Sequence, residues 1–65
     1  MNISLKQARR LKDKTQFEMS SLLKIHVQTY RKIENNPDLA TVEQAKKISN
    51  YLKIPYDEIF FATNS

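Results

Sequence analysis

Apolar residues recur at roughly helical spacing near the N-terminus, with lysines and arginines between them. Such a pattern is typical of an amphipathic helix with one buried face. It predicts a first helix that ends near residues 13–14. Either Asn2 or Ser4 is its cap, since both side chains can accept a backbone hydrogen bond. Its predicted buried residues are Ile3, Leu5, Ala8 and Leu11.

Two further helices follow, with only a tight turn between them. Residues 15–18 read TQFE, the form of a capping box, in which the Thr hydroxyl accepts from the N–H three residues on and the Glu side chain bonds back. They predict the start of a second helix. A third is predicted to begin near Val27, because residues 24–26 leave room only for a turn. The predicted buried residues of the pair are Met19, Leu22, Leu23, Tyr30 and Ile33.

The second half of the chain predicts two more helices. Residues 35–38 read NNPD, a strong stop, because Asn tolerates the left-handed conformation and Pro disfavours helix in the residue before it. A second capping box, TVEQ at residues 41–44, opens a fourth helix that Pro55 ends, and a short fifth helix begins at Tyr56. The predicted inner residues are Ala45, Ile48, Tyr51, Leu52, Ile59 and Phe60 or Phe61.

Composition supports an all-α fold, a compact bundle of five short helices that forms one domain over residues 1–65. A chain of 65 residues is one domain at most. Glycine is absent, whereas tight β-hairpins usually need it at positive φ. The alternation of apolar and polar residues that marks strands is missing as well.

The titratable residues argue against catalysis and metal binding. There is no cysteine, and His26 is the single histidine, so the chain lacks the ligands of a typical zinc site. No nucleophile–base pair, Gly-rich phosphate loop or paired carboxylates are apparent in the sequence. We expect no enzyme, no metal and no cofactor. Since no apolar run approaches the roughly 18 residues that cross a membrane, no membrane association is expected; the lack of cysteine fits a reducing cytoplasm.

Charge and helix spacing together point to nucleic acid. Eleven Lys and Arg against seven Asp and Glu give a net charge of +4, which favours a polyanionic partner. The second and third helices are separated by about three residues, the spacing of a helix-turn-helix, whose second helix enters the DNA major groove. In that third helix a polar and basic face lies opposite the apolar one. Its residues are Gln28, Thr29, Arg31 and Lys32.

The joint spacing of these residues resembles the Cro/phage-repressor class of helix-turn-helix proteins, the XRE family. The similarity covers roughly residues 5–60 and is most specific at Gln16, at the small Ser20 and at the Ile33-Glu34-Asn35 ending. The resemblance implies a lambda-repressor-like fold with the helix-turn-helix at about 16–34. It also implies a bacterial or phage-encoded cytoplasmic protein that binds double-stranded DNA.

Two positions depart from the family pattern. Lys24 stands in the turn where the family usually has Gly, so either Lys24 adopts a positive φ at a cost of about 1 kcal/mol or the turn is reshaped. Asn36 replaces a second Gly, and we expect it to adopt the left-handed conformation as a tolerable substitute.

The resemblance makes Gln28 the leading base reader, since its amide can bond adenine N6 and N7 as a pair worth about 1–3 kcal/mol of discrimination. Beside it, Val27 is placed to meet a thymine methyl. Lys32 lies on the same face as Gln28 and is suited to a guanine edge or a phosphate, whereas Arg31 is expected in the groove or at the backbone. The alternative is an ordinary solvated face. The predicted base-contacting residues are Val27, Gln28, Arg31 and Lys32.

Other residues are expected to position the domain on the DNA backbone. By resemblance, Gln16 holds a phosphate at the N-terminus of the second helix and also bonds the side chain of Gln28. His26 is expected to act as a helix cap or to contact a phosphate. The predicted backbone-contacting residues are Thr15, Gln16, His26, Thr29, Asn36 and Thr41.

Arg9 and Glu34 are similar to a family ion pair that joins the first helix to the end of the third, and we assign them to structure. By the same resemblance, near-palindromic operators would be read by a homodimer, at least on DNA. Ile59, Phe60 and Phe61 form more apolar surface than a short terminal helix can bury, so they are candidates for a dimer contact. Alternatively both Phe residues are core and the free protein is a monomer.

The leading hypothesis is therefore a small transcriptional regulator, favoured to be a repressor, that binds double-stranded DNA sequence-specifically with its third helix in the major groove. One alternative is a protein-interaction module, an antirepressor or an antitoxin-like protein, that docks a protein partner on the helix-turn-helix surface. Another is general nucleic-acid packaging, for which binding would depend on salt and not on sequence.

Overall fold

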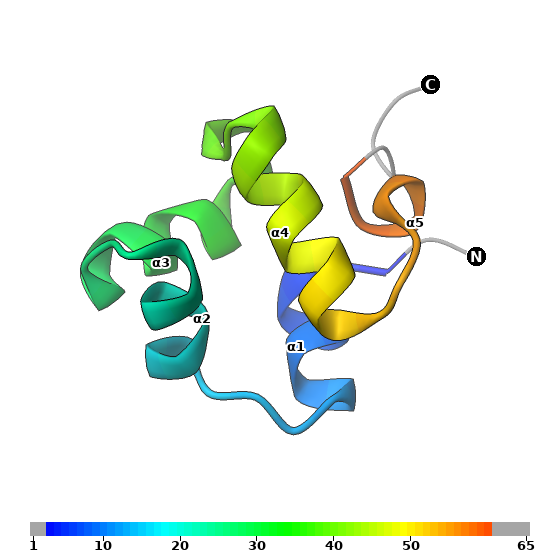
Figure 1. The fold of residues 1–65 in the computed structure, drawn as a ribbon, viewed down its shortest axis with the longest axis horizontal. Coiled ribbons are helices and arrows are strands. Elements are labelled where there is room, and N and C mark those ends of the chain that lie inside the picture. The colour runs from blue at the N-terminus through cyan, green and yellow to red at the C-terminus, as the bar shows by residue number, and fades with distance from the viewer. Residues whose placement is uncertain (1–2, 61–65) are drawn as a thin grey trace.

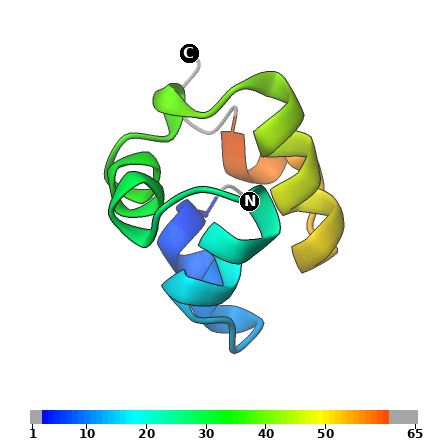
Figure 2. The ribbon, with the colours of Figure 1, turned by 60° about the vertical axis from the view of Figure 1, so that its left-hand side comes forward.

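The computed structural model describes residues 3–60, and within them the chain forms helices and no strand, which confirms the all-α prediction (Figure 1). The elements are α1 (Leu5–Leu11), α2 (Gln16–Leu23), α3 (Val27–Asn35), the 3-10 turn η1 (Pro37–Leu39), α4 (Val42–Leu52) and α5 (Tyr56–Phe60). Helix α2 packs against α3 and α4, and α5 packs against α4 and α1 (Figures 1 and 2). None of these helices is long and apolar enough to span a membrane.

Three helices begin with a complete capping box. Ser4 caps α1: its Oγ accepts from the backbone N–H of Gln7 at 3.0 Å, and the Gln7 side chain accepts from the Ser4 N–H at 3.0 Å. Asn2, the other candidate cap, lies outside the described residues. The boxes predicted at Thr15 and Thr41 are confirmed. Each such cap contributes about 1 kcal/mol, so local sequence fixes where the helices start.

Helix ends depend on left-handed residues that are not glycine. Lys24 ends α2 with φ 58°, which is the first of the two alternatives considered for the turn of the helix-turn-helix. Asp13 and Lys53 adopt φ 57° in the same way, which the sequence did not reveal. The prediction for Asn36 is wrong, since its φ is −142°. Pro37 follows directly, and a residue before proline is pushed into the extended region.

The core lies where α1, α2, α3, α4 and α5 converge, and its largest fully buried side chain is that of Tyr30. Of the predicted core residues, Ile3 and Leu22 are only partly buried against the core, and Leu11 and Tyr51 are exposed. Leu11 is 70% exposed, because at about 100° per residue it points roughly 120° away from Leu5. Tyr51 is 37% exposed, and the ammonium of Lys14 lies over its ring, 5.0 Å from the ring centroid. The buried apolar residues are Leu5, Ala8, Met19, Leu23, Tyr30, Ile33, Ala45, Ile48, Leu52, Ile54 and Ile59.

Candidate nucleic-acid interface

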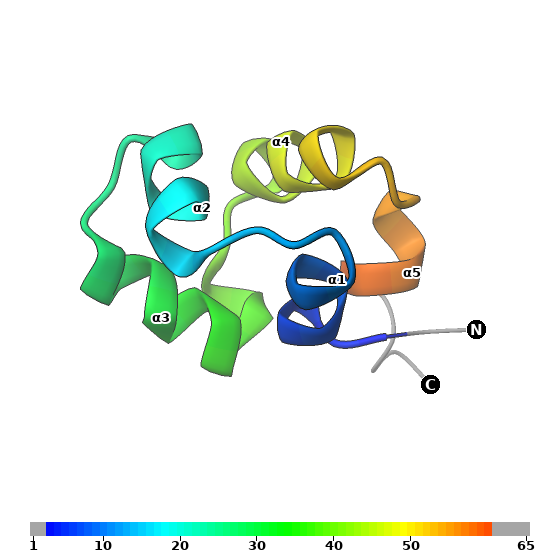
Figure 3. The ribbon, with the colours of Figure 1, turned by 90° about the horizontal axis from the view of Figure 1, so that it is seen from below.

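Helix α3 lies along one outer edge of the domain, on the side opposite α5 (Figure 3). Tyr30 and Ile33 are buried, at 0% and 3% exposure, and hold the helix to the core. The remaining face carries the side chains predicted to read bases. Val27 is partly buried, whereas the exposed residues are Gln28, Thr29, Arg31 and Lys32. The helix therefore presents a polar, basic surface on a fixed apolar base.

The turn between α2 and α3 fixes the angle of that surface. The N–H of Lys24 donates to Ser21 O at 3.1 Å, and the N–H of Ile25 donates to Ser20 O at 3.0 Å. Ser20 is 2% exposed, and its hydroxyl donates to the carbonyl of Phe17 at 2.7 Å. A small side chain with an internal bond partner leaves room for α3 to pack against α2. The left-handed Lys24 thus replaces the usual glycine without reshaping the turn.

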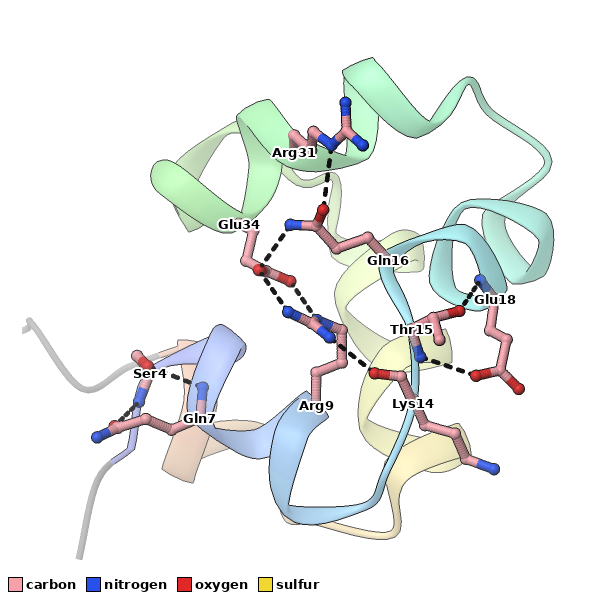
Figure 4. A network of polar contacts seen from close by, with 9 residues as sticks. All are labelled: Ser4, Gln7, Arg9, Lys14, Thr15, Gln16, Glu18, Arg31 and Glu34. Atoms are coloured by element: carbon pink, nitrogen blue, oxygen red, sulfur yellow. Dashed lines mark hydrogen bonds and ion pairs between the residues drawn. The ribbon is translucent and has the colours of Figure 1, made fainter.

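Arg9 and Glu34 form a bidentate ion pair between α1 and α3 (Figure 4). Arg9 Nε donates to Glu34 Oε2 at 2.8 Å and Nη2 donates to Oε1 at 3.2 Å. The third donor, Nη1, reaches the carbonyl of Lys14 at 2.7 Å. The two side chains are only 11% and 4% exposed. The pair therefore joins α1, the loop before α2 and the end of α3.

Burial alone would raise the pKa of Glu34, but hydrogen bonds from Arg9 and its neighbours outweigh burial and hold this pKa below its usual range. Glu34 is therefore a carboxylate at neutral pH. The buried hydroxyl of Tyr30 lies near these charges and makes no hydrogen bond within residues 3–60. Burial, and then Glu34, raises the pKa of Tyr30, so its phenol stays neutral.

Gln16 bridges the ion pair to the outer face of α3 (Figure 4). Its Nε2 donates to Glu34 Oε1 at 3.0 Å, and its Oε1 accepts from Arg31 Nε at 3.0 Å. The expected bond to Gln28 is not formed in the structure. Gln28 lies on the outward side of α3, while Arg31, nearly one turn further on, reaches back to α2. This partnership was missed from the sequence, which carries no signal for it beyond the two residue types.

The other residues predicted to contact the DNA backbone surround α3, and all of them are exposed. The hydroxyls of Thr15 and Thr41 accept from the N–H groups of Glu18 and Gln44, each at 3.0 Å, so both also serve as caps. His26 occupies the cap position of α3, but its side chain makes no capping bond. Thr29 lies on α3 itself, and Asn36 follows its last residue.

The fold leaves only part of the candidate dimer contact accessible to a partner. Ile59 is 4% exposed and belongs to the core, so its side chain is not available to a partner. Phe60 is partly buried against the core, and its ring centroid lies 5.5 Å from that of Tyr56. Phe61 lies outside the described residues. Of the three residues, only Phe60 is shown with part of its surface free.

Some features had no counterpart in the sequence analysis. Large apolar side chains are exposed on both sides of the helix-turn-helix. Phe17, in the first turn of α2, is 68% exposed, and Leu39 and Val42, which follow α3, are 56% and 62% exposed. Residues 3–60 contain no group of three or more His, Cys, Asp or Glu placed to hold a metal ion.

Comparison with known families assigns this arrangement of helices to a family. A family described as Helix-turn-helix matches residues 5–59, from the start of α1 to α5. Comparison with curated proteins and with solved structures gives no match. The family is one of DNA-binding domains, typically of transcriptional regulators and typically without catalytic activity. Because the match covers most of the chain, the protein belongs to the XRE (Cro/C1-type) helix-turn-helix family and has a lambda-repressor-like fold.

Proposed function

We propose that the protein is a sequence-specific transcriptional regulator, a repressor, that binds double-stranded DNA with α3 in the major groove. The observation that carries the proposal is the two-sided character of α3. Its inner residues Tyr30 and Ile33 are buried, while Gln28, Arg31 and Lys32 are exposed next to a hydrogen-bonded turn. A helix so mounted can present side chains to base edges without unfolding.

Each outer residue of α3 has a distinct role in this proposal. Gln28 reads adenine through its amide, and Lys32, four residues later on the same face, donates to a guanine edge or a phosphate. Val27 packs on a thymine methyl. Arg31 contacts the groove or the backbone. The residues proposed to hold the sugar–phosphate backbone are Thr15, Gln16, His26, Thr29, Asn36 and Thr41.

The proposal includes a homodimer on DNA. Two copies of α3 would enter successive major grooves on one side of the duplex, about 34 Å apart, and would read a near-palindromic operator in the cytoplasm. Phe60 is the described residue of the C-terminal cluster with apolar surface left for a two-fold contact.

Selection of bound duplexes from a random-sequence DNA pool, at near-physiological salt, tests the proposal. Enrichment of a two-fold symmetric motif with half-sites about one helical turn apart is the expected result. Binding without enrichment would indicate a packaging protein held by phosphate charge alone. No binding to any duplex would favour the protein-interaction module, an antirepressor or antitoxin-like protein.

Gln28→Ala sharpens the test on the selected site. Losing a bidentate amide contact should lower specific affinity by roughly 5- to 150-fold while leaving non-specific binding unchanged. Asn50→Ala is the matched control, because it removes another exposed amide, on α4 rather than α3. Equal effects of the two substitutions, or equal losses on specific and non-specific DNA, would contradict base reading by Gln28.

A further inference from the structure

Four side chains form one continuous hydrogen-bonded chain from the interior to the outer face of α3 (Figure 4). Arg9 binds Glu34, Glu34 accepts from Gln16, and Gln16 accepts from Arg31. The chain crosses from α1 to α3, then to α2, and returns to α3. Its inner end is nearly buried, and its outer end, Arg31, is exposed. An exposed arginine is thus tied to an ion pair whose side chains are only 11% and 4% exposed.

The chemistry of the two neighbours fixes the amide of Gln16 in one orientation. A carboxylate can only accept hydrogen bonds, and a guanidinium can only donate them. Glu34 therefore requires the amide NH₂ group, which leaves the amide oxygen toward Arg31, as the two 3.0 Å bonds show. In the flipped amide, the NH₂ group would face the guanidinium donors of Arg31 and the oxygen would face the Glu34 carboxylate, so neither hydrogen bond could form. The orientation of Gln16 is set by Glu34 and carries over to Arg31.

Glu34 is itself a rigid anchor. Arg9 holds both of its oxygens and is held in turn by the carbonyl of Lys14 at 2.7 Å. The carboxylate side chain is only 4% exposed, so water competes little for these bonds. The pKa of Glu34, lowered on balance by these bonds against the effect of burial, keeps the anchor ionised at neutral pH. An anchor of this kind transmits a fixed geometry to Gln16.

We infer that Gln16 is a positioning residue that holds the Arg31 guanidinium in its binding orientation before DNA arrives. The inference rests on the proposed function. Arg31 uses only Nε toward Gln16, and its two Nη groups have no hydrogen-bond partner within residues 3–60. Those donors suit the acceptor atoms of DNA, either phosphate oxygens or O6 and N7 of guanine. Ordering an arginine in advance lowers the entropy cost of binding.

A double-mutant cycle on DNA affinity tests the inference. Gln16→Met keeps the length of the side chain but removes both hydrogen bonds, and Arg31→Ala removes the side chain that is positioned. In the parent, Gln16→Met should weaken binding to the selected duplex about tenfold, the scale of one charge-assisted hydrogen bond. In the Arg31→Ala background only the proposed backbone contact of Gln16 remains to be lost, so the same substitution should weaken binding less than about threefold. Equal effects in both backgrounds would mean that Gln16 acts on DNA alone, and would overturn the inference.

Lys32→Ala is the matched control, because Lys32 is an exposed cation of α3 that takes no part in the hydrogen-bonded chain. Gln16→Met and Lys32→Ala should therefore be additive. The salt dependence of binding identifies the DNA partner of Arg31. Loss of a phosphate contact lowers the slope of log affinity against log salt by about 0.9, whereas loss of a guanine contact leaves this slope unchanged.

A measurement on the free protein separates this inference from the proposed function. Exchange of the Arg31 Nε–H with solvent, followed by NMR, should be slow in the parent and fast in Gln16→Met. Urea unfolding of the same variant shows whether the fold is kept. A parent that binds no duplex overturns the proposed function and the inference with it. A parent that binds DNA but shows fast exchange, or an additive cycle, overturns the inference alone.

Discussion

Arg9→Ala should remove a large part of the stability of the domain. The substitution deletes three hydrogen bonds of 2.7–3.2 Å. Glu34, whose side chain is 4% exposed in the parent, keeps the Gln16 amide as its remaining donor within residues 3–60. Removing one partner of such an enclosed pair costs about 3–5 kcal/mol, because the other charge stays buried without compensation. At roughly 0.05–0.15 kcal/mol per residue, a domain of this size has only about 3–10 kcal/mol in total.

Urea unfolding followed by circular dichroism at 222 nm and neutral pH measures the loss. Lys47→Ala is the control, since it breaks an ion pair with Glu43 that spans 3.7 Å between side chains 49% and 81% exposed. An exposed pair of this kind contributes about 0.5 kcal/mol or less. A loss below about 1 kcal/mol for Arg9→Ala, or one no larger than that of Lys47→Ala, would refute the reasoning.

The same reasoning predicts a partial rescue. Arg9→Met combined with Glu34→Leu removes both charges and leaves apolar groups of similar length. Apolar replacements of a buried pair are often neutral or stabilising, so the double variant should be more stable than Arg9→Ala by at least about 2 kcal/mol. A double variant as unstable as Arg9→Ala would show that the hydrogen bond to Lys14, and not the stranded Glu34 charge, carries the cost.

Three further predictions concern the same domain. The pKa of Glu34 is lowered in the folded state, so as pH falls the unfolded chain binds the Glu34 proton before the folded chain does. The stability that Glu34 contributes is therefore complete above the ordinary pKa of 4.5 and is lost as pH falls below it. Glu34→Gln should flatten this loss in urea melts from pH 3 to 7. Lys24→Gly should raise the free energy of unfolding by up to about 1 kcal/mol, because Lys24 has φ 58°, while Lys12→Gly, at φ −98°, should not. Thr41→Ala should lower the free energy of unfolding by about 1 kcal/mol by removing the cap of α4, and Thr41→Ser should restore it, as thermal melts can show.

Features encoded within three or four residues could be predicted from the sequence. The capping boxes at Thr15 and Thr41 are examples, because each depends on bonds inside one short segment. For Lys24 the sequence left two alternatives open, and the structure shows the left-handed one. The exposure of Leu11 was misjudged, because only roughly helical spacing was required of the apolar residues, and Leu11 lies about 120° around α1 from Leu5. The extended Asn36 was misjudged as well, since Pro37 outweighs the tolerance of Asn for positive φ.

The candidate site divides in the same way. The exposed face of α3 follows from the burial of Tyr30 and Ile33, which the sequence pattern predicted. The partner of Gln16 did not follow, because the sequence does not say which side chains of α3 face the start of α2. Only the placement of α3 relative to α2 decides between Gln28 and Arg31. Helix existence is thus local information, whereas the choice among polar partners is a property of the packed domain.

An ion pair between α1 and α3 calls for an explanation other than stability. A buried pair gives little net gain over apolar residues of the same volume, and a 65-residue domain has little stability to spare. What apolar residues cannot do is orient an amide. Glu34 fixes the amide of Gln16, and Gln16 fixes Arg31, only because Glu34 is a charged acceptor held by Arg9. The rescued double variant separates the two roles: it should regain stability without regaining the coupling between Gln16 and Arg31 in DNA affinity.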